Sequence, residues 1–311
     1  MNAEIFGEWL RRRGHRVIEA CGSFWFEQAH RVFQAFPYHW LIHPEEHALQ
    51  EMLRHYGMIT ARYSTPLDAP YGLRSYHAIY EAPEYNLEML SKWTRKNVRR
   101  GLSQCRIEPI TFERLATEGW LLQCDTLARQ GRYGAITRPI WERLARSAAN
   151  LPGFEAWGAL VGQELAAAVI VFPMVDAYYL LYQSSRTDLL SARPNNALCY
   201  VLTHDLLSRP GTRMILYGLH SLDAPTSVDE FKFRMGYSPK PVRQRAVFHP
   251  AAAPLINRFS HTLLRAVSGI LPYSPLLAKA EGMMRFYIQG KLTLAQQPIP
   301  GIRVEGHERT D

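Results

Sequence analysis

Three strand-like segments joined by two tight turns restrict the fold of this chain more than any other feature. They cover Phe154–Leu160, Glu164–Phe172 and Ala177–Ser184. Such short connections allow antiparallel pairing only, so the segments predict a meander. The middle segment, ELAAAVIVF, is apolar on both faces, which is typical of a central strand covered on both sides. We therefore expect Leu165–Phe172 to be among the most buried residues of the chain.

The residues that follow the meander extend it into a longer α/β order. A helix is predicted over Pro194–Ser208, because proline is favourable at the first helical position. A strand follows at Arg213–Tyr217, then a short helix that ends at Gly236, then a strand at Val242–Phe248. The order strand, strand, strand, helix, strand, helix, strand predicts a mixed, mainly antiparallel sheet flanked by helices.

The first half of the chain has a weaker version of the same alternation. Three strand-like pieces lie between residues 15 and 35, and a helix is predicted from Pro44 to His55. Strands follow at Met58–Ser64 and Tyr76–Tyr80. Asn86 is a plausible N-cap for the helix that comes next.

The helix predicted after Asn86 has a strongly basic face. At about 100° per residue, one side is apolar and carries Leu87, Leu90, Val98 and Leu102. The opposite arc carries five cations and no acid: Lys92, Arg95, Lys96, Arg99 and Arg100. Exposed helices usually mix both signs of charge, so this arc favours a surface that attracts phosphate. The solvated face of an ordinary amphipathic helix is the alternative.

Charge and cysteine content limit the class of protein. The 311 residues carry a formal net charge of +8, which favours an anionic partner such as phosphate, nucleic acid or an anionic membrane. The four cysteines form no CxxC pair, so neither a zinc site nor a disulfide framework is expected, and we predict no metal. The N-terminus lacks the apolar core of a signal peptide, and no apolar run has the length of a membrane span. We expect a cytoplasmic protein.

The chain becomes helical again after Pro250. Leu255–Ile270 and Leu276–Leu292 are apolar with interspersed arginine and lysine. We favour packing of these helices onto the domain, which is the commoner use of an apolar helix face. The alternative is peripheral contact of residues 255–292 with the anionic inner face of a membrane. Residues 296–311 are predicted to form a disordered tail.

Two short motifs lie in this order, one in each half of the chain. EFKFRMG, at residues 230–236, places a Phe-Lys pair before a glycine, and SKWTRKNVRRGLSQC, at residues 91–105, is rich in basic residues. Motifs and order together resemble the FemAB-like, BioF2-like branch of the GNAT acyltransferase superfamily over roughly residues 15–248. The resemblance implies a partial second GNAT-like copy in residues 1–110 and an acyltransferase core in residues 111–250. A helical extension (251–295) and the tail (296–311) would complete the chain.

The resemblance implies transfer of an acyl or aminoacyl group from an activated donor to an amine. Ordinary GNAT enzymes have a glycine-rich pyrophosphate loop, and the equivalent segment here, SSRTDLLSARPNNAL, has no glycine. Acyl-CoA is the first expectation for the co-substrate, and aminoacyl-tRNA or an acyl carrier protein stays open. The acceptor would be a small molecule or a cell-envelope-precursor amine.

Lys232 and His220 are the candidate catalytic residues. Lys232 matches the lysine that the FemAB family uses to stabilise charge in the reaction, and a cation close to a developing oxyanion would do this. An imidazole such as His220 can take a proton from an amine near neutral pH. A surface lysine and a structural histidine are the alternatives. The weaker candidate bases are Asp223, Asp229 and Glu230.

Four residues are candidates for binding the donor. Arg186 and Arg193 flank the turn before the Pro194–Ser208 helix, and both could bind phosphate. Asn195 and Asn196 place backbone N–H groups at the open N-terminus of that helix. Solvated arginines in a basic protein are the alternative interpretation.

The remaining candidates would contact substrate. Strand alternation predicts that Tyr178 and Tyr182 share one face of the third meander strand, with Tyr179 on the other. We place Tyr182 in the cleft, although core packing would also explain all three. The other candidates are Phe231, Arg95, Lys96 and Arg99. A non-catalytic scaffold that binds nucleic acid or an anionic membrane is the alternative function.

Overall fold

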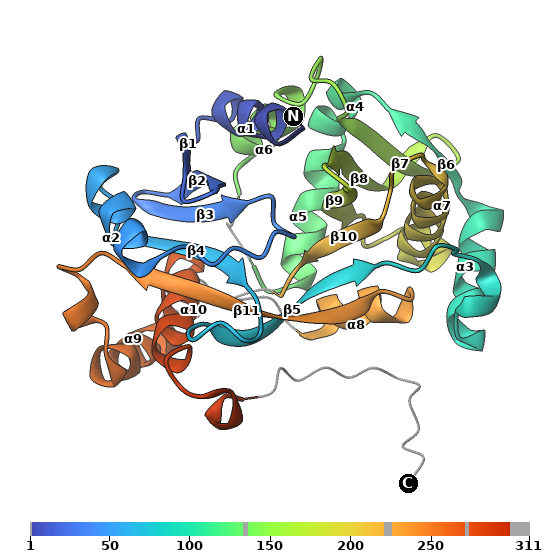
Figure 1. The fold of residues 1–311 in the computed structure, drawn as a ribbon. Coiled ribbons are helices and arrows are strands. Elements are labelled where there is room, and N and C mark those ends of the chain that lie inside the picture. The colour runs from blue at the N-terminus through green and yellow to red at the C-terminus, as the bar shows by residue number, and fades with distance from the viewer. Residues whose placement is uncertain (1, 133–135, 221–225, 271–273, 299–311) are drawn as a thin grey trace, which may run out of the picture.

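A computed structural model describes residues 2–132, 136–220, 226–270 and 274–298 of the chain (Figure 1). The strands are β1 (Val17–Ala20), β2 (Ser23–Ala29), β3 (Val32–Phe36), β4 (Thr60–Thr65), β5 (Leu73–Tyr80), β6 (Arg106–Ile110), β7 (Glu155–Val161), β8 (Glu164–Met174), β9 (Ala177–Ser185), β10 (Met214–Leu219) and β11 (Ser238–Phe248). The helices are α1 (Asn2–Arg12), α2 (Glu46–His55), α3 (Lys92–Gln104), α4 (Phe112–Thr117), α5 (Gly119–Arg129), α6 (Arg138–Arg146), α7 (Pro194–Ser208), α8 (Thr226–Arg234), α9 (Arg258–Ile270) and α10 (Pro275–Gln289).

These strands form one mixed sheet with helices packed on both sides, which confirms the predicted fold class. The strand order is β1-β2-β3-β4-β11-β5-β10-β9-β8-β7-β6. Neighbouring strands are antiparallel, except that β3–β4 and β9–β10 are parallel. Each parallel pair follows a three-strand run and is connected through a helix, α2 in the first copy and α7 in the second. The N-terminal half therefore repeats part of the GNAT-like order.

The two copies share strands within that sheet. β11 from the second half lies between β4 and β5, and β5 in turn pairs with β10. β6, from the first half, forms the far edge beside β7. Residues 1–110 and 111–250 therefore contribute strands to the same sheet.

β8 is the doubly covered central strand that its sequence predicts. Residues Leu165–Phe172 are each 2% exposed or less, and β8 pairs antiparallel with β7 and β9. Its side chains alternate between two cores, one beneath α1 and α5 and one beneath α7. The first core takes Ala168, Ile170 and Phe172, and the second takes Ala167, Val169 and Val171. Burial of both faces explains the uninterrupted apolar run.

β9 and β10 diverge after a short parallel pairing. Met214, Ile215 and Leu216 of β10 lie opposite residues 177–179 of β9, and the pairing stops there. β10 continues beside β5, while β9 continues beside β8. Among the described strands, the end of β9 therefore has a partner on one side only, and a wedge opens in the sheet.

The basic helix begins later than the sequence analysis predicts. Asn86 caps only the short 3-10 turn Leu87–Met89, whereas Ser91 caps α3 by accepting a hydrogen bond from the Thr94 N–H at 3.3 Å. The predicted apolar face is therefore wrong in part, because Leu102 is exposed. The buried face of α3 consists of Thr94, Asn97, Val98 and Gly101.

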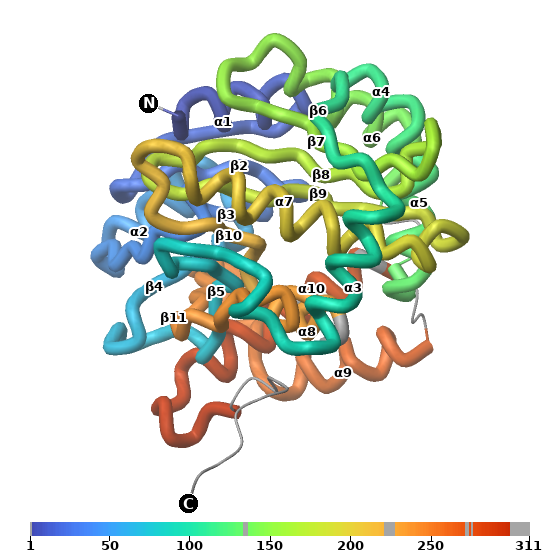
Figure 2. Tube along the Cα trace, turned by 90° about the vertical axis from the view of Figure 1, so that its right-hand side faces the viewer, coloured from blue at the N-terminus to red at the C-terminus, as the bar shows by residue number. Residues whose placement is uncertain are grey.

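Gly101 lets α3 cross the N-terminus of α7 at close range; Figure 2 shows the two helices side by side. A Cβ atom at this position would lie 2.7 Å from the Arg193 carbonyl oxygen and 2.9 Å from the Ala197 Cβ. Both neighbours are rigid parts of α7 and its first turn. The sequence therefore needs glycine here, although glycine is a poor helix former.

Replacing Gly101 by alanine is expected to lower the free energy of unfolding by about 1–3 kcal/mol, the usual cost of overpacking. This loss should outweigh the gain of about 1 kcal/mol in helix propensity. Gly269→Ala in α9 is the matched control, because a Cβ atom there would meet no described residue within 4 Å, and it should be neutral or stabilising. Denaturant titration measures both, and equal effects would contradict the close α3–α7 contact.

The C-terminal helices behave differently from each other. α10 packs against β11 through Met283, Met284 and Phe286, as predicted. α9 packs on α10 but leaves most of its apolar residues exposed. Gln297 is buried and donates a hydrogen bond to the Gly72 carbonyl at 3.0 Å, so the predicted disorder from residue 296 is wrong at its start. The rest of that tail, from residue 299, lies outside the described residues.

None of the helices in the described ranges is both long enough and apolar enough to cross a bilayer.

Candidate active site

The wedge between β9 and β10 forms part of a cleft of about 730 Å³. Other side chains along its walls come from α5, α6, α8, α10, β2 and the segment after α1. The wall from β9 carries Tyr182, Gln183 and Ser185, and Tyr217 enters from β10. Lys232 and Phe231 reach the same cleft from α8.

Lys232 is held in this cleft by a buried carboxylate. Its Nζ donates to Asp229 Oδ1 at 2.6 Å, and Tyr76 Oη donates to Asp229 Oδ2 at 2.6 Å. The two charged residues lie three apart in α8, a spacing that brings side chains together on one helix face. Lys232 Nζ also lies 5.4 Å from the centre of the Tyr217 ring. The lysine is 8% exposed as a residue and its ammonium has a fixed direction, as an electrostatic catalyst needs.

A chain of hydrogen bonds runs along the cleft wall from Tyr217 to Arg129. Tyr217 Oη donates to Gln183 Oε1, and Gln183 Nε2 donates to Asn195 Oδ1 at 3.2 Å. Asn195 Nδ2 then donates to Ser185 Oγ at 2.8 Å. Arg129 Nη2 donates to the same hydroxyl at 2.8 Å and to the Ser185 carbonyl at 3.0 Å. These bonds fix the unpaired end of β9 beside the first turn of α7.

The cleft carries positive charge. Among the described residues that line it, five are cationic and none is acidic; the cations are Arg13, Arg129, Arg132, Lys232 and Lys279. Burial lowers the pKa of Arg129, with Asp125 acting in the opposite direction, from a value so high that the guanidinium stays charged at neutral pH. Such a cleft attracts anions such as phosphates.

The predicted donor-binding residues are only partly gathered at this cleft. Asn195 lines it, whereas Asn196 Nδ2 points to the Met235 sulfur at 3.4 Å. Arg186 forms ion pairs with Asp188 at 2.5 Å and with Glu164 at 3.2 Å, outside the cleft lining. Arg193 occupies the N-cap position of α7 in a left-handed conformation, with φ 59°.

His220 lies beside the cleft rather than within its lining. Its ring stacks on Tyr76 with centroids 4.6 Å apart, and Nδ1 is 3.2 Å from Ser75 Oγ. Burial lowers the pKa of His220 to about 4, despite the opposing charge of Asp229. A base of this pKa is neutral at pH 7 but holds a proton weakly. Asp223 lies outside the described residues, and Asp229 is occupied by Lys232 and Tyr76.

Tyr182 lines the cleft, but it does so from a face that simple alternation does not predict. In the β8–β9 pairing, Ile170 lies opposite Leu181 and Ala168 lies opposite Ser184, so a bulge shifts the register between these two pairs. Tyr182 lies in this bulge and has φ 54°. The centroid of its ring lies 6.2 Å from that of Trp9, and its hydroxyl accepts a hydrogen bond from Arg13 at 3.0 Å. The bulge therefore turns Tyr182 toward the core of Tyr179, and the predicted pairing with Tyr178 is wrong.

The basic face of α3 does not line the cleft. Arg95 pairs with Glu88 at 2.5 Å, so the predicted absence of acids beside this face does not hold in the folded chain. Lys96 and Arg99 are exposed on the outer side of α3. Gly101 is the residue of α3 that contacts the start of α7. The basic face of α3 therefore lies beyond the N-terminus of α7.

Several cleft residues have no signal in the sequence. Arg13 follows α1, Arg129 ends α5, and Lys279 belongs to α10, so they come from three separate parts of the chain. Only the folded sheet brings them together. The local sequence offers one weak indication, because Arg129 and Arg132 lie close together on either side of Gln-Gly at the end of a helix.

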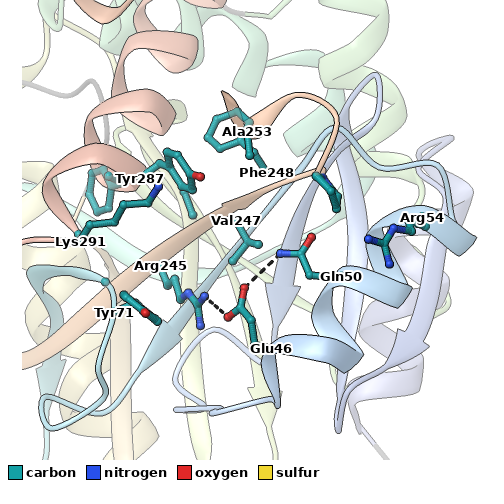
Figure 3. A pocket seen from close by; sticks show the side chains of 15 residues that line it. Glu46, Gln50, Arg54, Tyr71, Arg245, Val247, Phe248, Ala253, Tyr287 and Lys291 are labelled. Atoms are coloured by element: carbon teal, nitrogen blue, oxygen red, sulfur yellow. Dashed lines mark hydrogen bonds and ion pairs between the residues drawn. The ribbon is translucent and has the colours of Figure 1, made fainter. Parts of the chain in front are cut away.

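A separate groove of about 640 Å³ lies between α2, β11 and α10 (Figure 3). Arg245 lies at its floor, where it pairs with Glu46, and Gln50 donates to the same carboxylate at 3.1 Å. Tyr71 stacks on the Arg245 guanidinium, 4.9 Å from the ring centre. No residue of β9 or β10 is among those that line this groove, whereas the Lys232 cleft lies where these two strands diverge, so we take the Lys232 cleft as the candidate site.

The order of the strands and helices follows the fold that the sequence predicts. A meander, a helix and a parallel strand that splays from the meander follow the order predicted for the GNAT acyltransferase core. The second copy in the first half and the Phe-Lys helix at the splay follow the FemAB-like variant of that order.

Comparison with known proteins gives the same fold. FemX matches with a TM-score of 0.53 and 10% identity, over 76% of this chain and 90% of that chain. The C-terminal domain of a protein named as a lysylphosphatidylglycerol synthetase, from Agrobacterium fabrum, matches with a TM-score of 0.51 and 14% identity, over 85% and 91%. A protein of unknown function from Bacteroides thetaiotaomicron matches with a TM-score of 0.50 and 11% identity, over 79% and 90%. No family model and no curated protein matches the chain. The predicted FemAB-like, GNAT-type fold is confirmed.

Protonation of a buried histidine in β5 should contribute to the loss of stability in acid. Burial lowers the pKa of His77 to about 3 from the usual 6.5, and His77 Nε2 lies 2.8 Å from Ser64 Oγ. The unfolded chain binds this proton first, so the free energy of unfolding should fall as the pH drops below 6.5, until the pH passes the folded value. The slope is at most about 1.4 kcal/mol per pH unit for one histidine. Denaturant titrations across this range should show a flatter profile for His77→Gln and an unchanged one for the exposed His47→Gln.

Proposed function

We propose that this protein is an N-acyltransferase that moves an acyl or aminoacyl group from an activated donor to an amine. The observation that carries the proposal is the buried Lys232 ammonium at a cationic cleft where β9 and β10 splay apart. An acyl transfer needs a preformed charge where the carbonyl oxygen becomes negative, and a buried ammonium of fixed direction can supply it.

The proposed reaction gives a role to three residues that line the cleft. The amine nitrogen attacks the donor carbonyl carbon, and the oxyanion that forms is stabilised by Lys232 Nζ. The carbon–sulfur bond of a thioester, or the carbon–oxygen bond of an aminoacyl ester, then breaks, and the leaving group takes up the proton lost by the amine. Tyr182 would contact the substrate at the mouth of the cleft, and Phe231 would contact it from α8.

The positive charge of the cleft also favours the reactive form of the acceptor. Nearby cations disfavour a protonated amine and lower its pKa. His220 is neutral at pH 7, since burial lowers its pKa to about 4, and it lies in the wall of an adjoining chamber. We therefore propose that loss of the amine proton depends on the cleft's charge more than on a strong base.

Phosphate-bearing donors suit this cleft. We propose that Arg129 and Asn195 bind donor phosphate beside the first turn of α7, because both lie in the hydrogen-bond chain of the cleft wall. Arg193 would support the same turn from its N-cap position. Acyl-CoA is the first candidate, and aminoacyl-tRNA or an acyl carrier protein is the second. The name lysylphosphatidylglycerol synthetase, carried by one structural neighbour, supports keeping an aminoacyl group among the candidates.

Native mass spectrometry with a panel of acyl-CoA, aminoacyl-tRNA and acyl carrier protein tests the proposal. We expect one donor to be retained and to lose its acyl group when an amine acceptor is added. Retention of duplex nucleic acid that weakens steeply with salt, and of none of the donors, would favour a nucleic-acid-binding scaffold instead.

A further inference from the structure

An apolar chamber of about 460 Å³ adjoins the Lys232 cleft. Three residues, Gln28, Arg132 and Lys279, line both cavities, so the two spaces meet at these side chains. The chamber extends from there between the end of β2, the starts of β3 and β4, the ends of β10 and β11, and helix α10. Most of its described wall is hydrocarbon, from residues that include Val32, Ile59, Leu219, Phe248, Met283 and Met284.

The Lys232 ammonium lies at the boundary between the cleft and the chamber. A Cβ atom placed on Gly218 of β10 would lie 3.5 Å from Lys232 Nζ. Gly218 stands between Tyr217, which lines the cleft, and Leu219, which lines the chamber. The ammonium is therefore beside β10 at the point where the residues of this strand pass from one cavity to the other.

The order of groups in an acyl donor matches the order of these two cavities. In a donor thioester the phosphates, the carbonyl and the acyl chain follow one another along the molecule. The proposed function places the phosphates at Arg129 and Asn195 and the carbonyl oxygen at Lys232. Neither Arg129 nor Asn195 lines the chamber, whereas Leu219, directly after Gly218, does. The acyl chain, which extends beyond the carbonyl, would therefore enter the chamber.

The chamber wall matches a hydrocarbon chain rather than a cationic group. Apolar walls bind such a chain in proportion to the area removed from water, and the flexible side chains of Met283 and Met284 adapt to its shape. No Asp or Glu is among the described residues that line either cavity. An aminoacyl group carries an ammonium, which would be buried here without a carboxylate partner and beside the cations Arg132 and Lys279. The wall therefore favours a neutral acyl chain over an aminoacyl group.

We propose that the chamber binds the hydrocarbon chain of the donor, and that the transferred group is a long fatty acyl chain carried as a thioester. In the transfer, the amine nitrogen bonds to the carbonyl carbon, the carbon–sulfur bond breaks, and the thiolate takes up the proton that the amine loses. The thioester belongs to coenzyme A or to a carrier protein, which have the same phosphopantetheine arm. This inference names the donor class of the proposed function and rests on that function for the reaction, whereas binding of the chain stands on the chamber alone.

Isothermal titration with acetyl-CoA, octanoyl-CoA and lauroyl-CoA tests the chain site without an acceptor or turnover. Each fully buried methylene strengthens binding by a factor of about four. We expect the Kd of lauroyl-CoA to be lower than that of acetyl-CoA by at least about a hundredfold, with octanoyl-CoA between them. Aminohexanoyl-CoA should bind at least about tenfold more weakly than hexanoyl-CoA, because the chamber would have to bury its ammonium.

Two variants fill the chamber from different walls. Ala280→Phe fills it from α10, and Ala29→Phe fills it from the end of β2, where the alanine is exposed and the fold should persist. Both should bind acetyl-CoA as the wild type does but bind lauroyl-CoA at least about tenfold more weakly. Ala266→Phe is the matched control, because Ala266 is exposed on α9 and lines neither cavity. Thermal unfolding checks the fold of each variant.

Three ligands with the same chain distinguish the two sources of the thioester. They are lauroyl-pantetheine, lauroyl-CoA and an acyl carrier protein loaded with a lauroyl group. Tighter binding of lauroyl-CoA than of the other two would assign the donor to coenzyme A, and tighter binding of the loaded protein would assign it to a carrier. In either case Ala280→Phe should weaken binding.

Equal Kd values for acetyl-CoA and lauroyl-CoA in the wild type would overturn the proposal, as would undiminished binding of lauroyl-CoA in both filled variants. Tighter binding of aminohexanoyl-CoA than of hexanoyl-CoA would assign the chamber to an aminoacyl group instead. Chain-dependent binding without transfer to any amine would reject the proposed function but leave the chain site intact. Transfer from acetyl-CoA without any dependence on chain length would reject the chain site and leave the proposed function intact.

Discussion

Replacing Lys232 by methionine is expected to lower kcat by a factor of roughly 10²–10³, the usual effect of removing one preorganised oxyanion-stabilising group. Methionine keeps most of the side-chain length and removes the charge. The donor Kd should change much less, because the oxyanion exists only after attack. Steady-state kinetics with the retained donor, together with calorimetric donor binding, measures both quantities.

The ion pair with Asp229 requires a second variant. Methionine at position 232 leaves the Asp229 carboxylate buried with Tyr76 as its remaining partner, and an unpaired buried charge destabilises a fold. The double variant Lys232→Met, Asp229→Asn removes both charges and should regain stability without regaining kcat. Lys240→Met, which breaks an exposed pair with Glu81, is the matched control and should keep full turnover. Full turnover in Lys232→Met would leave the fold assignment intact but would reject the mechanism.

Arg129→Gln is expected to raise the donor Kd by roughly tenfold to a hundredfold, since a hydrogen bond to a charged group contributes about 1.5–3 kcal/mol. The Arg129 guanidinium donates to neutral oxygens of Thr126, Ser185 and Thr187, so its charge stays available to a phosphate. At saturating donor, kcat should remain within a few-fold of the wild type. Isothermal titration with the donor that the protein retains measures the change in Kd.

Arg186→Gln provides the comparison for Arg129. The Arg186 charge is already matched by Asp188 and Glu164, outside the cleft lining. We expect only a small change in donor Kd for this variant. A larger effect at Arg186 than at Arg129 would move the phosphate site to the turn before α7, where the sequence pattern alone placed it.

The strands with a strong local pattern were predictable from the sequence. The β7–β9 meander follows from short turns and an apolar middle strand, and α7 begins at Pro194 and ends at Ser208 as predicted. In these segments local preference and tertiary packing favour the same structure. The Phe-Lys helix also reaches the cleft, as the resemblance implied.

The site was less predictable because it depends on irregular and long-range features. A bulge turns Tyr182 to the opposite face, and strict alternation contains no sign of it. Arg13 and Arg129 meet at the cleft only because the sheet brings α1 and α5 together on β8 and β9. Glu88, which neutralises Arg95, lies outside α3, so counting charges on one helix missed it.

A crystal structure with a non-transferable donor analogue would test the central claim most directly. The analogue's phosphates should contact Arg129 and Asn195, and its carbonyl oxygen should lie about 2.7–3.1 Å from Lys232 Nζ, the distance at which a donor stabilises an oxyanion. An analogue bound in the groove of Arg245 and Tyr71 (Figure 3), or one whose carbonyl points away from Lys232, would contradict the assignment of the active site.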